Sequence, residues 1–282
     1  MKFGIIANTN KDSSPATLAS LCKLLKDRGH EWVLETDTSC LIENGPGIPA
    51  AQLKDHCDII AVLGGDGTML NASYRIGACT KPIAGINTGH LGFLTSCSEH
   101  ELERLISAIE NDKFTVSPHT LLTATIESTD GSQRQFTALN EVTLTRGHTS
   151  RMVSLDTRIN GEVLNQYRAD GLIVATPTGS TAYSLSAGGP LVAPDANIFL
   201  VTPICPHSLS NRTMVVADSS LIEVTPSEKT EETLFFNADG RDIVEVKPGS
   251  HVKIKKAAHV LPLLTISDTS FFKTVRTKLR WH

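Results

Sequence analysis

Residues 58–68 read Asp-Ile-Ile-Ala-Val-Leu-Gly-Gly-Asp-Gly-Thr, an apolar run that leads into a glycine loop. An apolar run without alternation is typical of a parallel strand covered on both faces. Residues 68–75 have the pattern of a helix, so the loop joins a buried strand to a helix N-terminus. In open α/β sheets, ligands bind outside the carboxyl ends of the strands, and this loop lies at such an end.

The first part of the chain repeats this alternation of strand and helix. Further strands are expected at residues 2–7, 31–34 and 82–86, and further helices at residues 15–28 and 99–111. Such repetition is the signature of an open α/β layer. We therefore predict a Rossmann-like α/β domain over residues 1–115.

After Phe114 the pattern changes to short strand-like segments separated by turn pairs such as Asn160-Gly161 and Asp239-Gly240. Strands are expected at residues 121–127, 135–144, 153–159, 162–167, 172–176, 198–202, 221–225, 234–237 and 252–255. We predict a mostly β domain over residues 116–268. Residues 269–282 form a tail with a basic helix, whose simple interpretation is a solvated face.

Composition limits the class of protein. The chain has 282 residues, a net charge of -4 and 40% hydrophobic residues, which excludes wholesale disorder and disfavours nucleic-acid binding. No apolar run approaches the length of a membrane helix, and residues 1–7 lack the pattern of a secretory signal. The six cysteines form no CxxC pair. We expect reduced thiols and a cytoplasmic location.

Asp66 is the unusual member of the glycine loop, because a polyphosphate repels a carboxylate. It fits if a cation intervenes, or if it accepts the proton of a hydroxyl that attacks phosphorus. The alternative is a tight turn in which Asp66 only caps the helix. The chain contains neither a Walker A motif nor a strict G-x-G-x-x-G. A P-loop enzyme is therefore excluded and an ordinary nicotinamide dehydrogenase is disfavoured.

Three further segments have features of a binding site. Residues 87–94 form a second glycine loop after a strand, where Phe93 could pack on a flat base or staple the next helix. Residues 170–186 contain the end of a strand followed by a turn that is rich in small and hydroxylated side chains. Such a turn could bind a nucleotide base and a ribose, or it could cap a helix. Asn140-Glu141 lies in a strand-like run, where the pair could hold a vicinal diol or form a polar outer face.

Other common chemistries lack their motifs. The histidines show no HExxH or other paired metal-ligand spacing, so no protein metal site is expected. Ser180 lacks the G-x-S-x-G elbow of a serine hydrolase.

Together these segments resemble the NAD kinase family, which phosphorylates the 2′-hydroxyl of the adenosine ribose of NAD. The resemblance rests on residues 64–68, 87–94, 140–141, 170–186 and 202–212, in the family's order. The first glycine loop is shared with diacylglycerol and sphingoid lipid kinases, whereas the Pro-Thr-Gly-Ser-Thr-Ala-Tyr segment at residues 177–183 is far more specific.

The resemblance implies an NAD kinase-like two-domain fold whose C-terminal tail returns to the first domain. It implies that Asp66 is the catalytic base and that Gly67 faces phosphate. It implies that Asn140 and Glu141 hold the ribose and that four residues surround adenine (Phe93, Thr178, Thr181, Ala182). The rest of the pocket would be lined by Asp170, Tyr183, Ser184, Leu185 and Ser186. Arg151 and Arg168 match binding positions of the family, and Arg241, at a position that varies in the family, is assigned to the pocket. It also implies ATP as donor, NAD as substrate, a divalent ion such as Mg²⁺ and a homo-oligomer, dimer or tetramer.

The residues alone leave two other functions possible. A lipid kinase with the same loop would need an exposed apolar groove, and a non-catalytic dinucleotide sensor would need no base at Asp66. ATP or polyphosphate as donor, and NAD or NADH as acceptor, are further alternatives.

Overall fold

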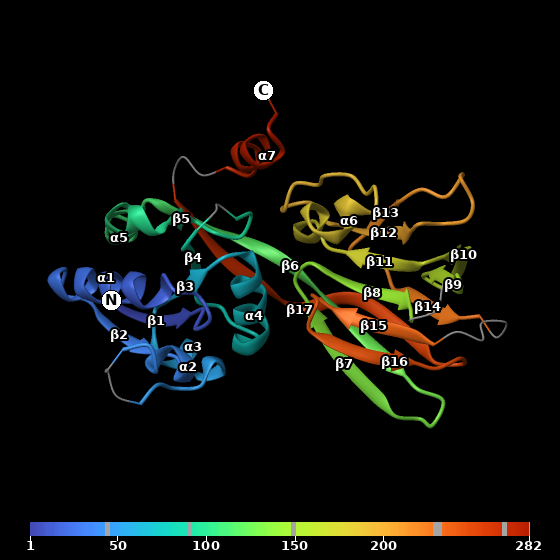
Figure 1. The fold of residues 1–282 in the computed structure, drawn as a ribbon, viewed down its shortest axis with the longest axis horizontal. Coiled ribbons are helices and arrows are strands. Elements are labelled where there is room, and N and C mark those ends of the chain that lie inside the picture. The colour runs from blue at the N-terminus through green and yellow to red at the C-terminus, as the bar shows by residue number, and fades with distance from the viewer. Residues whose placement is uncertain (43–45, 90–91, 148–150, 228–232, 267–269, 282) are drawn as a thin grey trace. The chain divides into compact units, whose positions relative to one another are not determined.

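The computed structural model describes all residues except 43–45, 90–91, 148–150, 228–232, 267–269 and 282 (Figure 1). The chain divides into two compact units, Met1–His119 with Val260–His282, and Thr120–His259. The first unit is α/β and the second is mostly β, which confirms the predicted fold class. The expected domain boundary at residues 115–116 falls within strand β6 (Phe114–Glu127). Residues from Val260 onward belong to the first unit, so the second unit ends at His259.

The first unit is built on a parallel sheet. Its strands are β1 (Lys2–Ala7), β2 (Glu31–Leu34), β3 (Ile59–Gly64), β4 (Ile83–Asn87) and β5 (Cys97–Ser98). The order is β2-β1-β3-β4, with β5 and the end of β17 (His251–Ile266) also paired to β4. Strand β3 is buried along its whole length, as its unbroken apolar run predicted.

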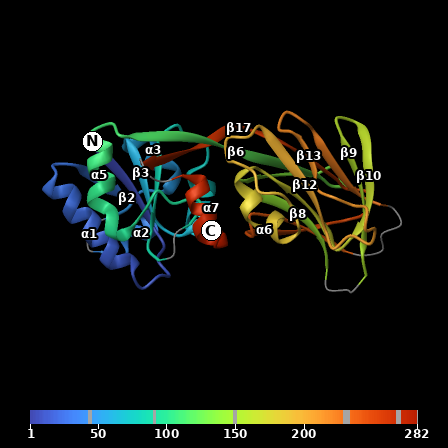
Figure 2. The same cartoon turned by 90° about the horizontal axis from the view of Figure 1, so that it is seen from above.

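Alternate residues of each strand point to opposite sides of the sheet, so both faces carry apolar side chains, and helices cover both faces. Phe3 and Ile5 join the apolar faces of α1 (Ser14–Asp27) and α5 (Leu102–Glu110), which lie side by side (Figure 2). Gly4, between them in sequence, faces α3 (Leu53–His56). Helix α4 (Asp66–Ile76) begins immediately after β3, so the glycine loop lies at the carboxyl end of the sheet. The short elements are α2 (Thr36–Ser39), η1 (Ala50–Gln52) and η2 (Glu99–Glu101).

The tail forms helix α7 (Phe271–Leu279), which belongs to the first unit. The Ser270 side chain caps it by accepting the N–H of Lys273, and Val275 is buried. His282, the end of the expected helix, lies outside the described residues.

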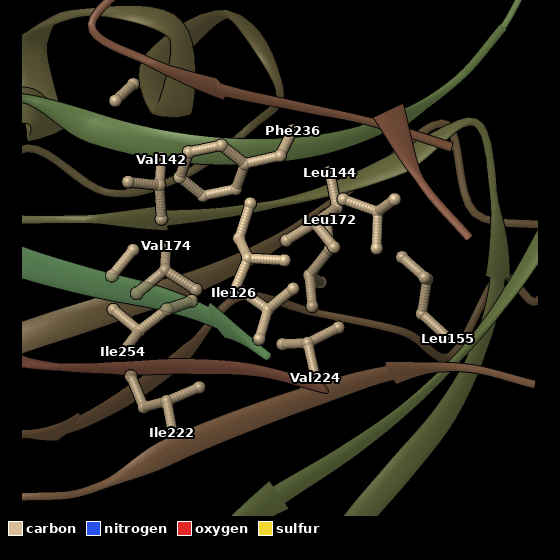
Figure 3. Packing of buried hydrophobic residues seen from close by; sticks show 14 of the residues in the cluster. Ile126, Val142, Leu144, Leu155, Leu172, Val174, Ile222, Val224, Phe236 and Ile254 are labelled. Carbon is tan, nitrogen blue, oxygen red and sulfur yellow. The ribbon is translucent and has the colours of Figure 1, made fainter. Parts of the chain in front are cut away.

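The second unit packs two antiparallel sheets on one core (Figure 3). One contains β6, β7 (Gln133–Ala138), β9 (Val153–Ile159), β10 (Glu162–Ala169), β14 (Ile222–Pro226) and β17. The other has the order β13 (Met214–Ala217), β12 (Ile198–Ile204), β11 (Gly171–Ala175), β8 (Glu141–Arg146), β15 (Leu234–Ala238), β16 (Asp242–Val246). Leu172 and Val174 point into the shared core, whereas Ile173 and Ala175 pack on the outer face near Ala187 and Val192.

One expectation for this unit was wrong, and two edge strands were not expected. Residues 135–144 are not one strand, because β7 and β8 belong to different sheets and the chain bends at Leu139 and Asn140 between them. Strands β13 and β16 lie at the two edges of their sheet and were not expected from the sequence. Strand β13 is a short apolar run of four residues that stays largely exposed, and β16 alternates buried with exposed side chains. No described helix is long and apolar enough to cross a membrane.

Candidate functional site

Asp66 links the two glycine loops of the first unit. Its Oδ2 accepts the backbone N–H of Phe93 at 3.0 Å, and its Oδ1 accepts that of Leu94 at 2.9 Å. Gly65 takes the N-cap position of α4, and no side-chain cap bond forms there. The capping alternative is therefore wrong. The carboxylate is held across the carboxyl edge of the sheet, and about a third of it remains exposed.

Gly92 makes this arrangement possible. A Cβ at position 92 would lie 2.1 Å from Oδ1 of Asp66 and 2.8 Å from its Cγ, distances that real Cβ atoms do not show. Glycine at position 92 therefore allows the backbone of the second glycine loop to approach the Asp66 carboxylate closely. His90 and Leu91, within the same predicted loop, lie outside the described residues.

Phe93 contacts the tail helix. Its ring centroid lies 6.2 Å from that of Phe271, and the Lys278 ammonium lies 4.7 Å from the Phe93 centroid. The same ammonium lies 3.4 Å from Oδ2 of Asp66. The assignment of Phe93 to adenine stays a prediction.

A polar cavity of about 470 Å³ opens beside the first glycine loop. Gly67 and Thr68 line it on the α4 side, and the amide residues Asn8, Asn10 and Asn71 also contribute. Asn8 donates to the hydroxyl of Thr68 at 3.2 Å. The N-terminal turn of α4 brings the positive end of the helix dipole to this place, which favours phosphate.

In the second unit, the turn that carries Asn140 and Glu141 is held by Asp239. The Asp239 carboxylate is almost fully buried and accepts the backbone N–H groups of Leu139 at 2.7 Å, Asn140 at 2.9 Å and Glu141 at 3.0 Å. Arg241 donates to the carbonyl oxygen of Thr137 at 2.8 Å. Asp239, at the tip of the β15–β16 hairpin, thus fixes the bend at which the chain passes from β7 in one sheet to β8 in the other.

The hydroxyl-rich turn packs directly on Asn140. Residues Thr178–Thr181 form η3 and residues Tyr183–Ser186 form α6. A Cβ at Gly179 would lie 2.1 Å from the backbone oxygen of Asn140, so glycine is required there for close packing. Thr176 donates its hydroxyl to the carbonyl oxygen of Leu139 at 2.6 Å. The structure therefore brings together two segments that the sequence singled out separately.

A cavity of about 530 Å³ lies beside these segments within the second unit. Its lining includes Glu141 and Tyr183 together with Thr143, Thr145, Phe235, Asn237, Asp239, Gly240 and Ile243. Tyr183 exposes 44% of its surface, so its ring is available to a ligand. Ser184 is fully buried, and its hydroxyl bonds that of Thr202 at 3.0 Å.

The other predicted contacts also lie in the second unit, and five of them belong to the hydroxyl-rich turn. Thr178 is buried, Thr181, Ala182 and Leu185 are half-buried, and Ser186 is exposed. Arg151 and Arg168 are exposed, and Asp170 forms an ion pair with Arg146 at 2.8 Å.

Glu141 has an unfavourable environment for a carboxylate. Burial raises its pKa to about 8, the negative charge of Asp239 adds to this rise, and the backbone N–H of Tyr183 opposes it. One of its oxygens, Oε2, is buried and has no hydrogen-bond partner among the described residues. Burial also raises the pKa of Asp239, against which the three N–H donors and Arg241 act. A buried carboxyl group with an unused oxygen at a cavity is suited to ligand binding rather than to stability.

Glu141→Gln should therefore stabilise the fold in a pH-dependent way. Because the pKa of Glu141 rises from 4.5 in the unfolded chain to about 8 in the fold, its destabilising effect begins above pH 4.5 and is complete above pH 8. The gain in melting temperature should be near zero at pH 4.5 and about 5 °C or more at pH 9. Thermal unfolding across this range tests it, with exposed Glu162→Gln as control. A gain independent of pH would contradict the assignment.

Two residues escaped the sequence argument. Asp239 appeared only as a member of a turn pair, although a buried acid at a hairpin tip can accept successive backbone N–H groups. Lys278 appeared only as part of a solvated basic face, and its distance of 212 positions from Asp66 in the chain left no local signal.

Comparison with known proteins identifies both halves of the chain. A model described as the ATP-NAD kinase N-terminal domain matches residues 49–114, and one described as the ATP-NAD kinase C-terminal domain matches residues 139–266. The NAD kinase of Chlorobium phaeobacteroides (strain BS1) is 38% identical over 281 residues, which cover 100% of this chain and 97% of the relative. That of Coxiella burnetii (strain Dugway 5J108-111) is 36% identical, over 99% of this chain and 94% of the relative.

Solved structures give the same result. Yeast NADH kinase complexed with NADH superposes with a TM-score of 0.90 at 25% identity, over 100% of this chain and 88% of that one. An NAD kinase from Archaeoglobus fulgidus in complex with ATP has a TM-score of 0.76 at 27% identity, over 99% of both chains. These matches favour NAD kinase over the lipid-kinase alternative. With family models covering both parts and relatives aligned over its whole length, the chain belongs to the NAD kinase family.

Proposed function

We propose that this chain transfers the terminal phosphate of ATP to the 2′-hydroxyl of the adenosine ribose of NAD, giving NADP and ADP, with Asp66 as the base. The observation that carries this proposal is the Asp66 carboxylate, fixed by two backbone N–H groups at the carboxyl end of β3. The NADH and ATP named with the two solved relatives support the same substrate classes here.

Asp66 would act on the acceptor hydroxyl. A ribose hydroxyl is a poor nucleophile until a base takes its proton, and a positioned carboxylate contributes about 10²–10⁴-fold to such a step. The bonds from Phe93 and Leu94 fix both oxygens of Asp66, so the base is oriented before the substrate arrives.

The polar cavity beside Gly67 and Thr68 is the best candidate for the ATP phosphates, because amide side chains and a helix N-terminus converge there. Arg75, which also lines it, is bonded to Glu35 and Asp37, so its charge is already balanced by carboxylates.

Mg²⁺ fits this arrangement as a companion of ATP. The described residues contain no group of three or more His, Cys, Asp or Glu side chains that could hold a metal ion. Phosphate oxygens and water commonly supply most ligands of nucleotide-bound Mg²⁺. When bound, the ion would offset the charge of the phosphates.

The cavity beside Glu141 and Tyr183 is the candidate NAD pocket. Glu141 can accept hydrogen bonds from a ribose diol, and Tyr183 offers a stacking surface with a polar tip. The remaining contacts proposed for NAD are those of Asn140, Phe93, Arg151, Arg168, Asp170, Thr178, Thr181, Ala182, Ser184, Leu185, Ser186 and Arg241. A homo-oligomeric state and a cytoplasmic location belong to the same proposal, and the six cysteines are free thiols in the structure.

Incubation of the purified chain with ATP, Mg²⁺ and NAD should yield NADP, measured by a coupled NADP-specific dehydrogenase. Parallel reactions with polyphosphate as donor and NADH as acceptor define the substrate range. Failure to form NADP with Mg²⁺, Mn²⁺ or Ca²⁺ would overturn the proposed activity.

A further inference from the structure

The C-terminal helix α7 places the ammonium group of one lysine next to the proposed base, Asp66. Lys278 lies in the last turn of α7, and its ammonium is 3.4 Å from Oδ2 of Asp66. That oxygen already accepts the N–H of Phe93, and the Lys278 ammonium also lies over the Phe93 ring. A single charged group therefore contacts both the carboxylate and the loop that orients it.

Lys278 is held more firmly than an isolated surface lysine. Helix α7 is anchored by the contact between Phe271 and Phe93, by the buried side chain of Val275 and by its Ser270 cap. The Lys278 side chain is only about one-third exposed, and its ammonium makes a cation–π contact at 4.7 Å. An ammonium that is positioned before the substrate binds loses little freedom during the reaction.

The proposed reaction needs positive charge at this place. The reacting hydroxyl must approach an oxygen of Asp66 to about 2.6–3.2 Å, and the attacked phosphorus must lie about 3–3.5 Å from that hydroxyl. The phosphoryl group in transfer is then within a few ångströms of a carboxylate that repels it. Protein kinases and P-loop enzymes place a lysine at their phosphates, but this chain has no such motif lysine in its glycine loop.

We propose that Lys278 is a further catalytic residue, whose ammonium binds the non-bridging oxygens of the phosphoryl group while it passes from ATP to the ribose. This inference rests on the proposed function. The bond between the 2′-oxygen and the terminal phosphorus forms as the bond from that phosphorus to the bridging oxygen of ATP breaks. ADP leaves with the electron pair, Asp66 receives the hydroxyl proton, and Lys278 stays protonated throughout.

Lys278→Met tests the charge, because methionine keeps an apolar stem over Phe93 but removes the ammonium. Lys278→Gln is a second neutral replacement, and Lys278→Arg restores the charge. Arg276→Met is the matched control, since it removes a basic side chain from an exposed position on the same helix. The readouts are kcat, the KM for ATP and for NAD, the affinity for NAD by calorimetry, and the melting temperature.

We expect Lys278→Met to lower kcat about 100-fold while NAD affinity and melting temperature stay near the parent values. Lys278→Arg should recover at least about tenfold of this loss, and Arg276→Met should remain within about twofold of the parent. The inference is overturned if both neutral variants keep kcat within about threefold of the parent, or exceed it. It is also overturned if kcat and melting temperature fall together and arginine restores neither, since Lys278 would then only dock α7. The parent chain is assayed first. If the parent forms NADP and the neutral Lys278 variants form it equally fast, this inference is refuted and the proposed function stands.

Discussion

Asp66→Asn should lower kcat by about 10²–10⁴-fold while the affinity for NAD changes only a few-fold. Asparagine has nearly the same shape, but its amide cannot take the proton of the 2′-hydroxyl. Its oxygen can still accept one of the two N–H groups that bond to Asp66, from Phe93 or Leu94. The loop therefore keeps part of its anchor, and the larger part of the loss should appear in turnover. Steady-state kinetics and calorimetric NAD binding measure the two effects separately.

Asp58→Asn is the matched control for this experiment. Asp58 lies directly before β3, whereas Asp66 lies two residues after its end, and the Asp58 carboxylate also accepts a backbone N–H, from Lys2 at 2.8 Å. Its replacement should leave kcat within about twofold of the parent. Equal losses of turnover and NAD affinity in Asp66→Asn would assign Asp66 to binding, and an unchanged kcat would remove it from the mechanism.

The fold was predictable where local patterns and buried faces agree. The expected strand at residues 153–159 matches β9, because buried residues alternate with partly exposed ones and leave a clear pattern there. The short strand expected at residues 31–34 also matches β2, although its burial is neither alternating nor continuous. The pairs Asn160-Gly161 and Asp239-Gly240 adopt positive φ at both positions, as turns of this type require. The bend at Asn140 was not predictable, because both flanking strands carry apolar residues and only tertiary pairing assigns them to different sheets.

The candidate site was predictable as a set of segments but not as a set of contacts. The glycine loop, the Asn140-Glu141 pair and the hydroxyl-rich turn each have an unusual local composition. The partners of Asp66 and of Asn140 come from distant parts of the chain, and no spacing rule relates Asp239 to Leu139 or Lys278 to Asp66. Such contacts depend on where the elements pack, which one sequence does not specify.

Gly92→Ala should lower kcat at least about 100-fold, although position 92 carries no functional group. The added Cβ would lie 2.1 Å from Oδ1 of Asp66, so the carboxylate must move and the bond from Leu94 to Oδ1 must lengthen or break. A displacement of about 1 Å in a catalytic group is enough to cost about 10²-fold in rate. NAD affinity should change less than kcat, because the proposed pocket beside Glu141 is built from residues of the second unit, and Phe93 is the one proposed NAD contact in the loop that contains Gly92.

The double variant Gly92→Ala with Asp66→Asn tests whether this loss acts through the carboxylate. If the methyl group harms turnover by displacing Asp66, its effect should largely vanish once Asp66 can no longer act as a base, so the two losses should not multiply. Losses that multiply would mean that Gly92 acts independently, for instance by direct contact with a substrate. A single Gly92→Ala variant with kcat within about threefold of the parent would show that the loop can relax around the methyl group, and that close approach at position 92 does not hold the base in place.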